Sequence, residues 1–359
     1  MEDPKRILIV RLSSLGDVVH SLPFAAALRR RFPAAKICWA VHPAFATMIP
    51  SPPWIDEIIP VPRPSLRHPI RLARDIAALR RRLHAERFDM VIDLQGLMKS
   101  AAVALLSGAP RKIGTSFMRE GSYLVCRPVR GPNAGNFDGG HVIEQALDVA
   151  RFLGAQQTDL FFPLPEQVGV WQQIRRCFAL KSSYALLVPG TRCETKCWPP
   201  EYFAELSNAL LEQGMDVVLL GSNSDIPRSK EILRLVNQSN AKETPARLID
   251  TTGKTNLPEM TALIQHCSLF VSGDTGPLHI AFAAKRSIVA LFGPTRPERS
   301  GPYGYSDAVN LQAPLPCRNC FKRKCSHLEC MRTITPDQVL EKCRDLLAKA
   351  ASQSTSDSS

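Results

Sequence analysis

The sequence predicts an α/β protein of two successive units, each a parallel β-sheet with helices on both of its faces. The chain has 359 residues, more than one domain usually contains, and 45% of them are hydrophobic. Short β-branched runs alternate with longer amphipathic segments up to Leu153, and the alternation begins again at Tyr184. We therefore expect a first domain over residues 1–170, a second over 180–335, a C-terminal helix over 336–350 and a disordered polar tail over 351–359, with a ligand cleft between the domains.

In the first half, β-branched runs predict strands and amphipathic runs predict helices. We expect strands at residues 6–12, 36–41, 57–61, 88–94 and 111–115. We expect helices at 17–31, 69–84 and 141–153, and a loop over 130–137, which is rich in Gly, Pro and Asn.

In the second half, apolar strands are each followed by a helix that begins at or near a proline. Strands are expected at residues 185–190, 217–222, around Leu248, at 268–274 and at 287–294. Helices are expected to begin at Pro200, Pro227, Pro258 and Pro277, because the missing N–H of proline costs nothing in a first helical turn.

The formal net charge of +12 predicts a polyanionic partner, which could be nucleic acid, an anionic membrane surface or a phosphorylated substrate. The first residues do not have the pattern of a signal peptide, and no apolar stretch is long enough to span a bilayer. We therefore expect a cytoplasmic protein whose eleven cysteines are reduced unless some of them bind a metal.

The first candidate site is the turn Ser13–Ser14–Leu15–Gly16–Asp17 after the first strand. A carboxylate at this turn would lie at the carboxyl edge of a parallel sheet, where ligands of such folds bind. Alternatively, Asp17 only caps the following helix.

The segment GDTGPLHIA, residues 273–281, follows an apolar strand and opens a helix. Gly276, the Thr275 hydroxyl and the free amides of the helix start suit a diphosphate, while Asp274 suits sugar hydroxyls and His279 falls on the first turn. The alternative is a capped, buried helix with a core histidine. The loop at 189–203 adds Thr191, Arg192 and Lys196 beside another helix start, either as further anion ligands or as a solvated turn.

Residues 63–87 contain eight arginines against Asp75 and Glu86. Leu72, Ile76, Leu79 and Leu83 recur at helical spacing and predict a stripe that faces the core. Because acidic partners are scarce, we expect the outer arginines to meet an anion rather than only water. The candidates are Arg63, Arg67, Arg71 and Arg74.

The run Cys317-x2-Cys320-x4-Cys325-x4-Cys330 resembles a zinc knuckle in its spacing. Phe321 and Lys324 stand where knuckles use glycine for tight turns, so reduced thiols in a surface loop are favoured over structural zinc.

Taken together, these motifs resemble those of glycosyltransferase family 9, the lipopolysaccharide heptosyltransferases. The resemblance covers nearly all of the chain up to Gly304. It rests on ILIVRLSSLGDVVHSLP from Ile7, FDMVIDLQGLMKSAA at 88–102, TRCETKCWP at 191–199 and SGDTGPLHIAFAAKRSIVALFGPTRPERSGPYG at 272–304. Heptosyltransferase I is the type favoured, and type II or another family 9 transferase remains the alternative.

The resemblance implies a GT-B fold of two Rossmann-like domains and an inverting transfer of L-glycero-D-manno-heptose from ADP-heptose to the Kdo of Kdo-lipid A. It implies Asp17 as general base and Lys196 as the residue that neutralises phosphate. Donor binding would involve Thr191, Arg192, Asn223, Asp274, Thr275, Gly276 and His279, and acceptor binding Ser14, Gly16 and Gln95 together with the arginines. Members of the family often have a glutamate that binds the nucleotide ribose after the strand equivalent to residues 217–221. This sequence has Asn223 and Asp225 in that region instead.

The resemblance further implies no tightly bound metal, with magnesium at most a stimulant, and an enzyme peripheral to the cytoplasmic face of the inner membrane. The rival from another class is a nucleic-acid-binding protein. It is disfavoured because the five tyrosines and four tryptophans are not interleaved with basic residues as in a single-strand platform. A non-catalytic GT-B relative is disfavoured by the joint presence of Asp17, Lys196 and Asp274.

Overall fold

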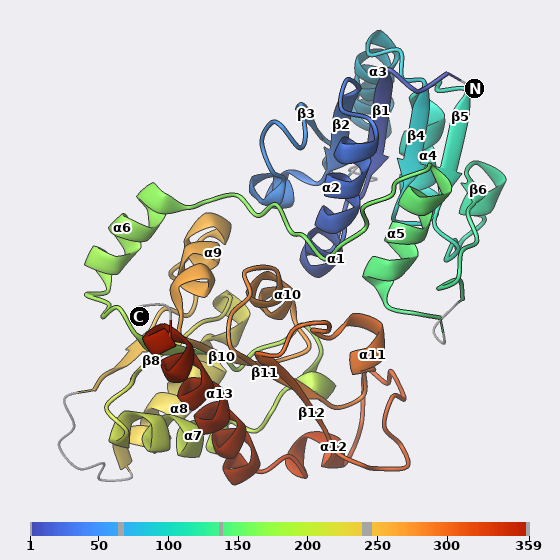
Figure 1. The fold of residues 1–359 in the computed structure, drawn as a ribbon. Helices are drawn as coiled ribbons and strands as arrows, with labels where there is room; N and C mark the ends of the chain where they lie inside the picture. Colours follow the sequence, from blue (N-terminus) through green and yellow to red (C-terminus); the bar gives the residue numbers. More distant parts are fainter. Residues whose placement is uncertain (1, 64–67, 136–138, 239–245, 357–359) are drawn as a thin grey trace. The chain divides into compact units, whose positions relative to one another are not determined.

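The computed structural model describes residues 2–63, 68–135, 139–238 and 246–356, and it divides into two compact units, Met1–Pro165 and Glu166–Ser359 (Figure 1). The division falls before the predicted domain end at residue 170 because helix α6 (Val168–Cys177) packs within the second unit. Trp171 of α6 stacks on His266 of helix α9 (Leu257–His266) with ring centroids 4.0 Å apart.

The N-terminal unit is a parallel six-stranded sheet in the order β3-β2-β1-β4-β5-β6. Its strands are β1 (Arg6–Val10), β2 (Lys36–Val41), β3 (Glu57–Pro60), β4 (Met90–Asp93), β5 (Arg111–Gly114) and β6 (Arg127–Pro128). Its helices are α1 (Leu15–His20), α2 (Leu22–Arg31), α3 (Pro69–Ala85), α4 (Met98–Leu106) and α5 (Val142–Phe152), with short 3₁₀ turns η1 (Pro43–Met48) and η2 (Ser122–Leu124).

The predicted elements of this unit are confirmed, with one helix divided. The helix expected at 17–31 is two helices, α1 and α2, because Pro23 stands in the first turn of α2 and has no N–H to continue the hydrogen bonds of α1. Strand β6 was not predicted, since two residues carry no alternation. The segment 130–135 has no helix or strand, as predicted, and residues 136–137 lie outside the described residues.

The C-terminal unit has a second parallel six-stranded sheet, in the order β12-β11-β10-β7-β8-β9. Its strands are β7 (Tyr184–Val188), β8 (Asp216–Leu219), β9 (Leu248–Asp250), β10 (Leu269–Gly273), β11 (Ile288–Phe292) and β12 (Ala308–Gln312). Besides α6 and α9, its helices are α7 (Pro200–Glu212), α8 (Ile226–Gln238), α10 (Gly276–Ala283), α11 (Pro297–Ser300), α12 (Glu329–Arg332) and α13 (Pro336–Ser356), with 3₁₀ turns η3 (Glu194–Lys196) and η4 (Asn223–Asp225).

The two sheets have the same strand order when each is counted from its own first strand. In each unit the order reverses between the first and fourth strands, which are β1 and β4 in one unit and β7 and β10 in the other. Ligands of doubly wound folds bind at this switch point, outside the carboxyl ends of the strands. The turns that follow these four strands carry Asp17, Gln95, Thr191 and Asp274.

Two predictions about helices are corrected. The stripe on α3 does not face the core along its whole length: Leu83 is fully buried, but Ile76 is 43% exposed, and Ile70 near the start of the helix is 86% exposed. Leu72 and Leu79 are half-buried, so the burial of the stripe is greatest toward the C-terminal end of α3, and α3 packs against the shorter helix α4. The tail expected to be disordered from 351 continues α13 to Ser356, since no proline or glycine interrupts it, and the last residues of the tail lie outside the described residues.

Among the described residues, no helix has both the length and the apolar character needed to cross a membrane.

Candidate functional site

Asp17 lies in the first turn of α1, at the carboxyl edge of the N-terminal sheet. Its Oδ2 accepts hydrogen bonds from the Ser14 backbone N–H at 2.9 Å and from the Ser14 hydroxyl at 2.8 Å, and its Oδ1 lies 2.9 Å from Nη2 of Arg11. The bond to the Ser14 amide is a helix-capping contact. The Asp17 side chain is nevertheless 40% exposed, so the carboxylate both caps the helix and remains open to a ligand.

Gln95 joins the end of β4 to the end of β1. Its Oε1 accepts a hydrogen bond from the Leu12 backbone N–H at 2.8 Å. Asp93 fixes the turn beneath it, because its carboxylate accepts the backbone N–H groups of Gln95 and Gly96 at 2.9 and 3.0 Å and the Ser100 hydroxyl at 2.9 Å. Burial raises the pKa of Asp93 although these hydrogen bonds oppose it. The structure therefore brings together four predicted residues of this unit: Ser14, Gly16, Asp17 and Gln95.

Two cations of this group were missed in the sequence. Arg11 is only 13% exposed and pairs with Asp17, and Lys99 donates a hydrogen bond to the Ser13 hydroxyl at 3.0 Å. Both lie within or beside the motifs already singled out, and a charge at the end of an apolar strand was the available signal for Arg11. They make this turn a place where a polar or anionic ligand meets two positive charges and one carboxylate.

In the C-terminal unit, Lys196, Asp274 and His279 form a second group, at the end of β10. Lys196 Nζ lies 2.6 Å from Asp274 Oδ2, and His279 Nε2 lies 3.7 Å from Asp274 Oδ1. Burial by itself raises the pKa of Asp274, but the charges of Lys196 and His279 outweigh it and the pKa is lowered. Asp274 is therefore an ionised, nearly buried acceptor. Thr295, missed in the sequence, lies beside Asp274 and also lowers its pKa.

Glycine permits the close approach of loops in this group. A Cβ at Gly273 would come within 2.6 Å of the Lys196 carbonyl oxygen and 3.3 Å of Thr191 Cγ2. A Cβ at Gly190 would collide with the Asp225 carboxyl carbon at 2.1 Å. Any larger residue at 273 would therefore push Lys196 away from Asp274.

The remaining predicted donor residues surround this group at the same edge of the sheet. Thr191 and Arg192 follow β7; Thr191 Oγ1 donates to the Cys193 carbonyl at 2.7 Å, and Arg192 is exposed. Thr275 and Gly276 form the start of α10. Asn223 is exposed in η4, after β8, where its Oδ1 would lie 2.5 Å from a Cβ at Gly253.

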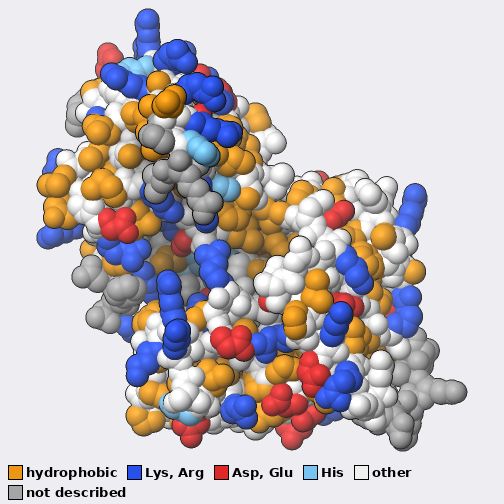
Figure 2. Space-filling model, turned by 180° about the vertical axis from the view of Figure 1, so that it is seen from behind, with side chains coloured by type: hydrophobic (Ala, Val, Ile, Leu, Met, Phe, Trp, Pro, Cys, Tyr) orange, Lys and Arg blue, Asp and Glu red, His pale blue; other side chains and the backbone are white. Residues whose placement is uncertain are grey.

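The predicted arginines that the structure describes belong to the loop after β3 and to α3 in the N-terminal unit. Arg63 is exposed in the loop after β3, Arg71 and Arg74 are exposed on α3, and Arg67 lies outside the described residues. The loop leaves β3 at the same sheet edge as Asp17, since β3 runs parallel to β1. Figure 2 shows Lys and Arg side chains beside hydrophobic ones on the upper lobe, the N-terminal unit.

The predicted cysteines Cys317, Cys320, Cys325 and Cys330 line one cavity of about 40 Å³ in the C-terminal unit, together with Thr195, Pro294, Lys322, His327 and Leu328. Burial raises the pKa of Cys330, and the three other cysteines act in the same direction.

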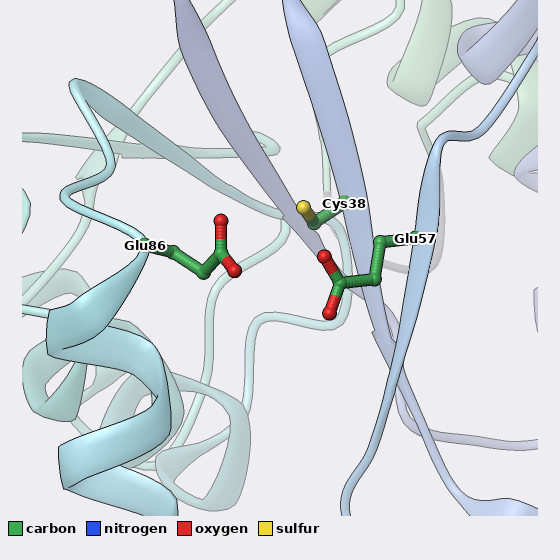
Figure 3. A group of neighbouring side chains, drawn as sticks. All are labelled: Cys38, Glu57 and Glu86. Atoms are coloured by element: carbon green, nitrogen blue, oxygen red, sulfur yellow. The ribbon is translucent and has the colours of Figure 1, made fainter.

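Cys38, Glu57 and Glu86 also lie close together, with ligand atoms within 4.8 Å of one another (Figure 3). Lys36 Nζ lies 2.7 Å from a carboxylate oxygen of each glutamate, which raises the lysine pKa. Burial raises the pKa of Cys38 to about 12, so its thiol is neutral. The lysine thus supplies the positive charge for these carboxylates, and the group ties β2 and β3 to the end of α3.

Known proteins share both the sequence and the fold. Residues 76–331 match the family model for glycosyltransferase family 9 (heptosyltransferase). The chain is 32% identical over 330 residues to lipopolysaccharide heptosyltransferase 1 of Pseudomonas aeruginosa, covering 90% of this chain and 88% of that protein.

Two solved structures share the fold over almost their whole length. A family 9 glycosyl transferase from Veillonella parvula has a TM-score of 0.80 at 23% identity, covering 97% of this chain and 99% of that one. The E. coli ADP-heptose lps heptosyltransferase II has a TM-score of 0.75 at 25% identity, covering 96% and 99%. The predicted GT-B class of two Rossmann-like units is thereby confirmed. The chain belongs to glycosyltransferase family 9, the heptosyltransferases, and is a glycosyltransferase.

Proposed function

We propose that the chain transfers L-glycero-D-manno-heptose from ADP-heptose to the Kdo of Kdo-lipid A, with inversion, in the assembly of the lipopolysaccharide inner core. The observation that carries this proposal is the Lys196–Asp274 pair at the end of β10, 2.6 Å apart, beside the start of α10. A lysine next to free helix amides suits a diphosphate, and a buried ionised carboxylate suits sugar hydroxyls. The name of the P. aeruginosa relative supports a lipopolysaccharide acceptor, and that of the E. coli structure supports ADP-heptose.

In this mechanism Lys196 turns from Asp274 to the donor diphosphate and offsets the charge that develops as ADP leaves. The amides at Thr275 and Gly276 add further donors, and Thr191, Arg192, His279 and the ribose candidate Asn223 complete the donor site. Because these groups neutralise the leaving group, transfer requires no tightly bound metal, and magnesium acts at most as a stimulant.

Asp17 takes the proton from the attacking Kdo hydroxyl. Ser14 and Arg11 fix the orientation of its carboxylate, while its 40% exposure leaves room for the acceptor. Gly16 is buried next to Asp17 in α1, and Gln95 holds the ends of β1 and β4 in place beside it.

The acceptor is an anionic amphiphile, and α3 has the matching surface. Exposed Arg71 and Arg74 stand beside the exposed apolar side chains of Ile70 and Ile76. Such a helix suits phosphates and an acyl–headgroup boundary. We therefore place the enzyme in the cytoplasm, peripheral to the inner face of the inner membrane, and assign Arg63, Arg67, Arg71 and Arg74 to the acceptor and the surface around it.

Type I transfer is favoured by the likeness to heptosyltransferase 1, and type II is the second candidate because a heptosyltransferase II shares the fold over most of the chain. Mass spectrometry of lipopolysaccharide from a strain that lacks the protein separates them. Truncation before the first heptose is expected. Loss of only the second heptose would identify type II, and an unaltered core would refute both.

A further inference from the structure

The cysteine loop, residues 317–330, lines a cavity in the C-terminal unit together with Thr195 and Pro294. All four of its cysteines line the same cavity of about 40 Å³. A cavity that four cysteines line is suited to one metal ion with tetrahedral thiolate coordination.

The backbone of the loop makes the tight turns that such a site needs. Asn319 and Phe321, on either side of Cys320, have φ of 63° and 54°, and Leu328, between Cys325 and Cys330, has φ of 50°. Non-glycine residues hold this left-handed conformation only where their surroundings impose it. In the sequence, the lack of glycine argued against a zinc knuckle. In the structure, Phe321 itself adopts the left-handed conformation that glycine would provide, so this objection no longer holds.

The basic side chains of the cysteine loop can offset the negative charge of a metal ion bound by four thiolates. Four deprotonated cysteines around a divalent ion carry a net charge of −2. The loop contains four basic side chains against one acidic one; these are Arg318, Lys322, Arg323 and Lys324, against Glu329.

The loop supports the donor group directly. Thr195, next to Lys196, donates a hydrogen bond to the Lys322 carbonyl at 2.8 Å. The Phe321 N–H donates to the Pro294 carbonyl at 2.8 Å, just after β11. Cys330 packs against the end of that strand, because a Cβ at Gly293 would lie 2.9 Å from its sulfur. Whatever fixes the loop therefore also fixes the segment that presents Lys196.

We propose that Cys317, Cys320, Cys325 and Cys330 bind one thiolate-preferring divalent metal ion, zinc or iron. The ion fixes the cysteine loop and, through the hydrogen bond from Thr195 to that loop, the segment that carries Lys196. Within the described part of the chain, no three of these sulfurs lie within 4.8 Å of one another. Metal–sulfur bonds of about 2.3 Å require the sulfurs to approach to about 4 Å, so the loop closes slightly around the ion and the thiols release their protons.

The metal content of the whole protein, purified without a metal-affinity column, tests the proposal independently of any activity. We expect about one equivalent of zinc or iron by plasma mass spectrometry, in keeping with a single site. Iron would give a protein that becomes coloured when air oxidises the ion to the ferric state, whereas zinc would give a colourless one. The four loop thiols should react with a thiol reagent only after metal removal, although Cys317 and Cys320 are exposed. Metal-free protein whose loop thiols react at once, or form disulfides by mass spectrometry, would overturn the proposal.

Variants locate the ion and its effect. Cys320→Ser and Cys325→Ser should lose the metal, whereas the control Cys177→Ser, exposed on α6, should retain it. Retention of one equivalent in both loop variants would exclude this site. The effect on Lys196 rests on the proposed function. In Cys320→Ser and Cys325→Ser we expect KM for ADP-heptose to rise about tenfold, as is typical when residues that support a site are replaced. A metal-free variant with unchanged KM would remove the link to Lys196, and an inactive wild-type protein that still contains metal would refute only the proposed function.

Discussion

At the scale of single residues, each site group depends on side chains that set one another's charge or orientation. Lys196 and Asp274 lie 78 positions apart, yet the pair decides the charge of the buried carboxylate. Arg11 and Ser14 do the same for the orientation of Asp17. The sequence could identify Asp17, Lys196 and Asp274 by their motifs. It could not identify Thr295 as a partner of Asp274, because only the fold brings the end of β11 to the end of β10.

Replacing Asp17 by Asn tests its role as base. We expect kcat to fall about 100-fold or more, since general-base catalysis contributes at least that much. Donor affinity, measured by calorimetry with ADP, should not change. The matched control Asp337→Asn, exposed on α13, should retain full turnover. Near-native turnover of Asp17→Asn would exclude the assignment.

Replacing Lys196 by Ala removes the cation that faces the diphosphate. The loss should be about 2–4 kcal/mol of transition-state stabilisation, seen as a lower kcat/KM for ADP-heptose. Lys230→Ala, exposed on α8, serves as the control. An unaltered kcat/KM in Lys196→Ala would show that the lysine only neutralises Asp274.

The lowered pKa of Asp274 gives a pH test of stability. A group whose pKa is lowered by folding stabilises the native state above its unfolded pKa of about 3.9, and this contribution is lost as the pH falls through the lower native value. In Lys196→Ala the buried carboxylate has lost its main partner, so the variant should be less stable at neutral pH. Urea unfolding measures the difference in the free energy of unfolding between the wild type and the variant. This difference should shrink below about pH 4, because Asp274 is then protonated in the unfolded chain and increasingly also in the folded variant. A difference independent of pH would contradict the role given to the pair.

At the scale of elements, the sequence predicted most strands and helices because each is an apolar run bounded by turn residues. The strands it missed are the edge strands β6 and β12: β6 has only two residues, and β12 is only half-buried and shows no apolar run. It also assigned the stripe of α3 wholly to the core. Periodicity indicates which side of a helix is apolar, but not whether a partner covers that side: Ile70 is 86% exposed and Ile76 is 43% exposed.

Mutations on the exposed face of α3 test whether this helix binds the anionic lipid acceptor. Arg71→Gln with Arg74→Gln should reduce sedimentation with anionic vesicles and raise KM for the lipid acceptor, because basic residues contribute about 1 kcal/mol each at such a surface. KM for ADP-heptose should stay constant, and added salt should weaken the binding of the wild type. The control pair Arg176→Gln and Arg234→Gln removes the same charge from exposed positions of the C-terminal unit. Equal losses for donor and acceptor, or losses in the control pair, would show that this face is only solvated.

At the scale of the whole molecule, two units of the same strand order each present a group of polar side chains at the switch point of a sheet. The N-terminal unit offers a carboxylate held by Arg11 and Ser14, and the C-terminal unit offers Lys196 with Asp274 and His279. The first set suits the deprotonation of an acceptor hydroxyl, and the second suits a nucleotide diphosphate sugar. This division of tasks follows from repeating one ligand-binding architecture along one chain.

The most direct test of heptose transfer is reconstitution of the reaction with the purified full-length protein, ADP-heptose and Kdo-lipid A, followed by mass spectrometry of the lipid and detection of ADP. We expect that one heptose is added to Kdo-lipid A with release of ADP, and that Asp17→Asn and Lys196→Ala both suppress this product. Binding of ADP-heptose without any addition of heptose to Kdo-lipid A would contradict this expectation, and so would addition only to an acceptor that already carries a heptose.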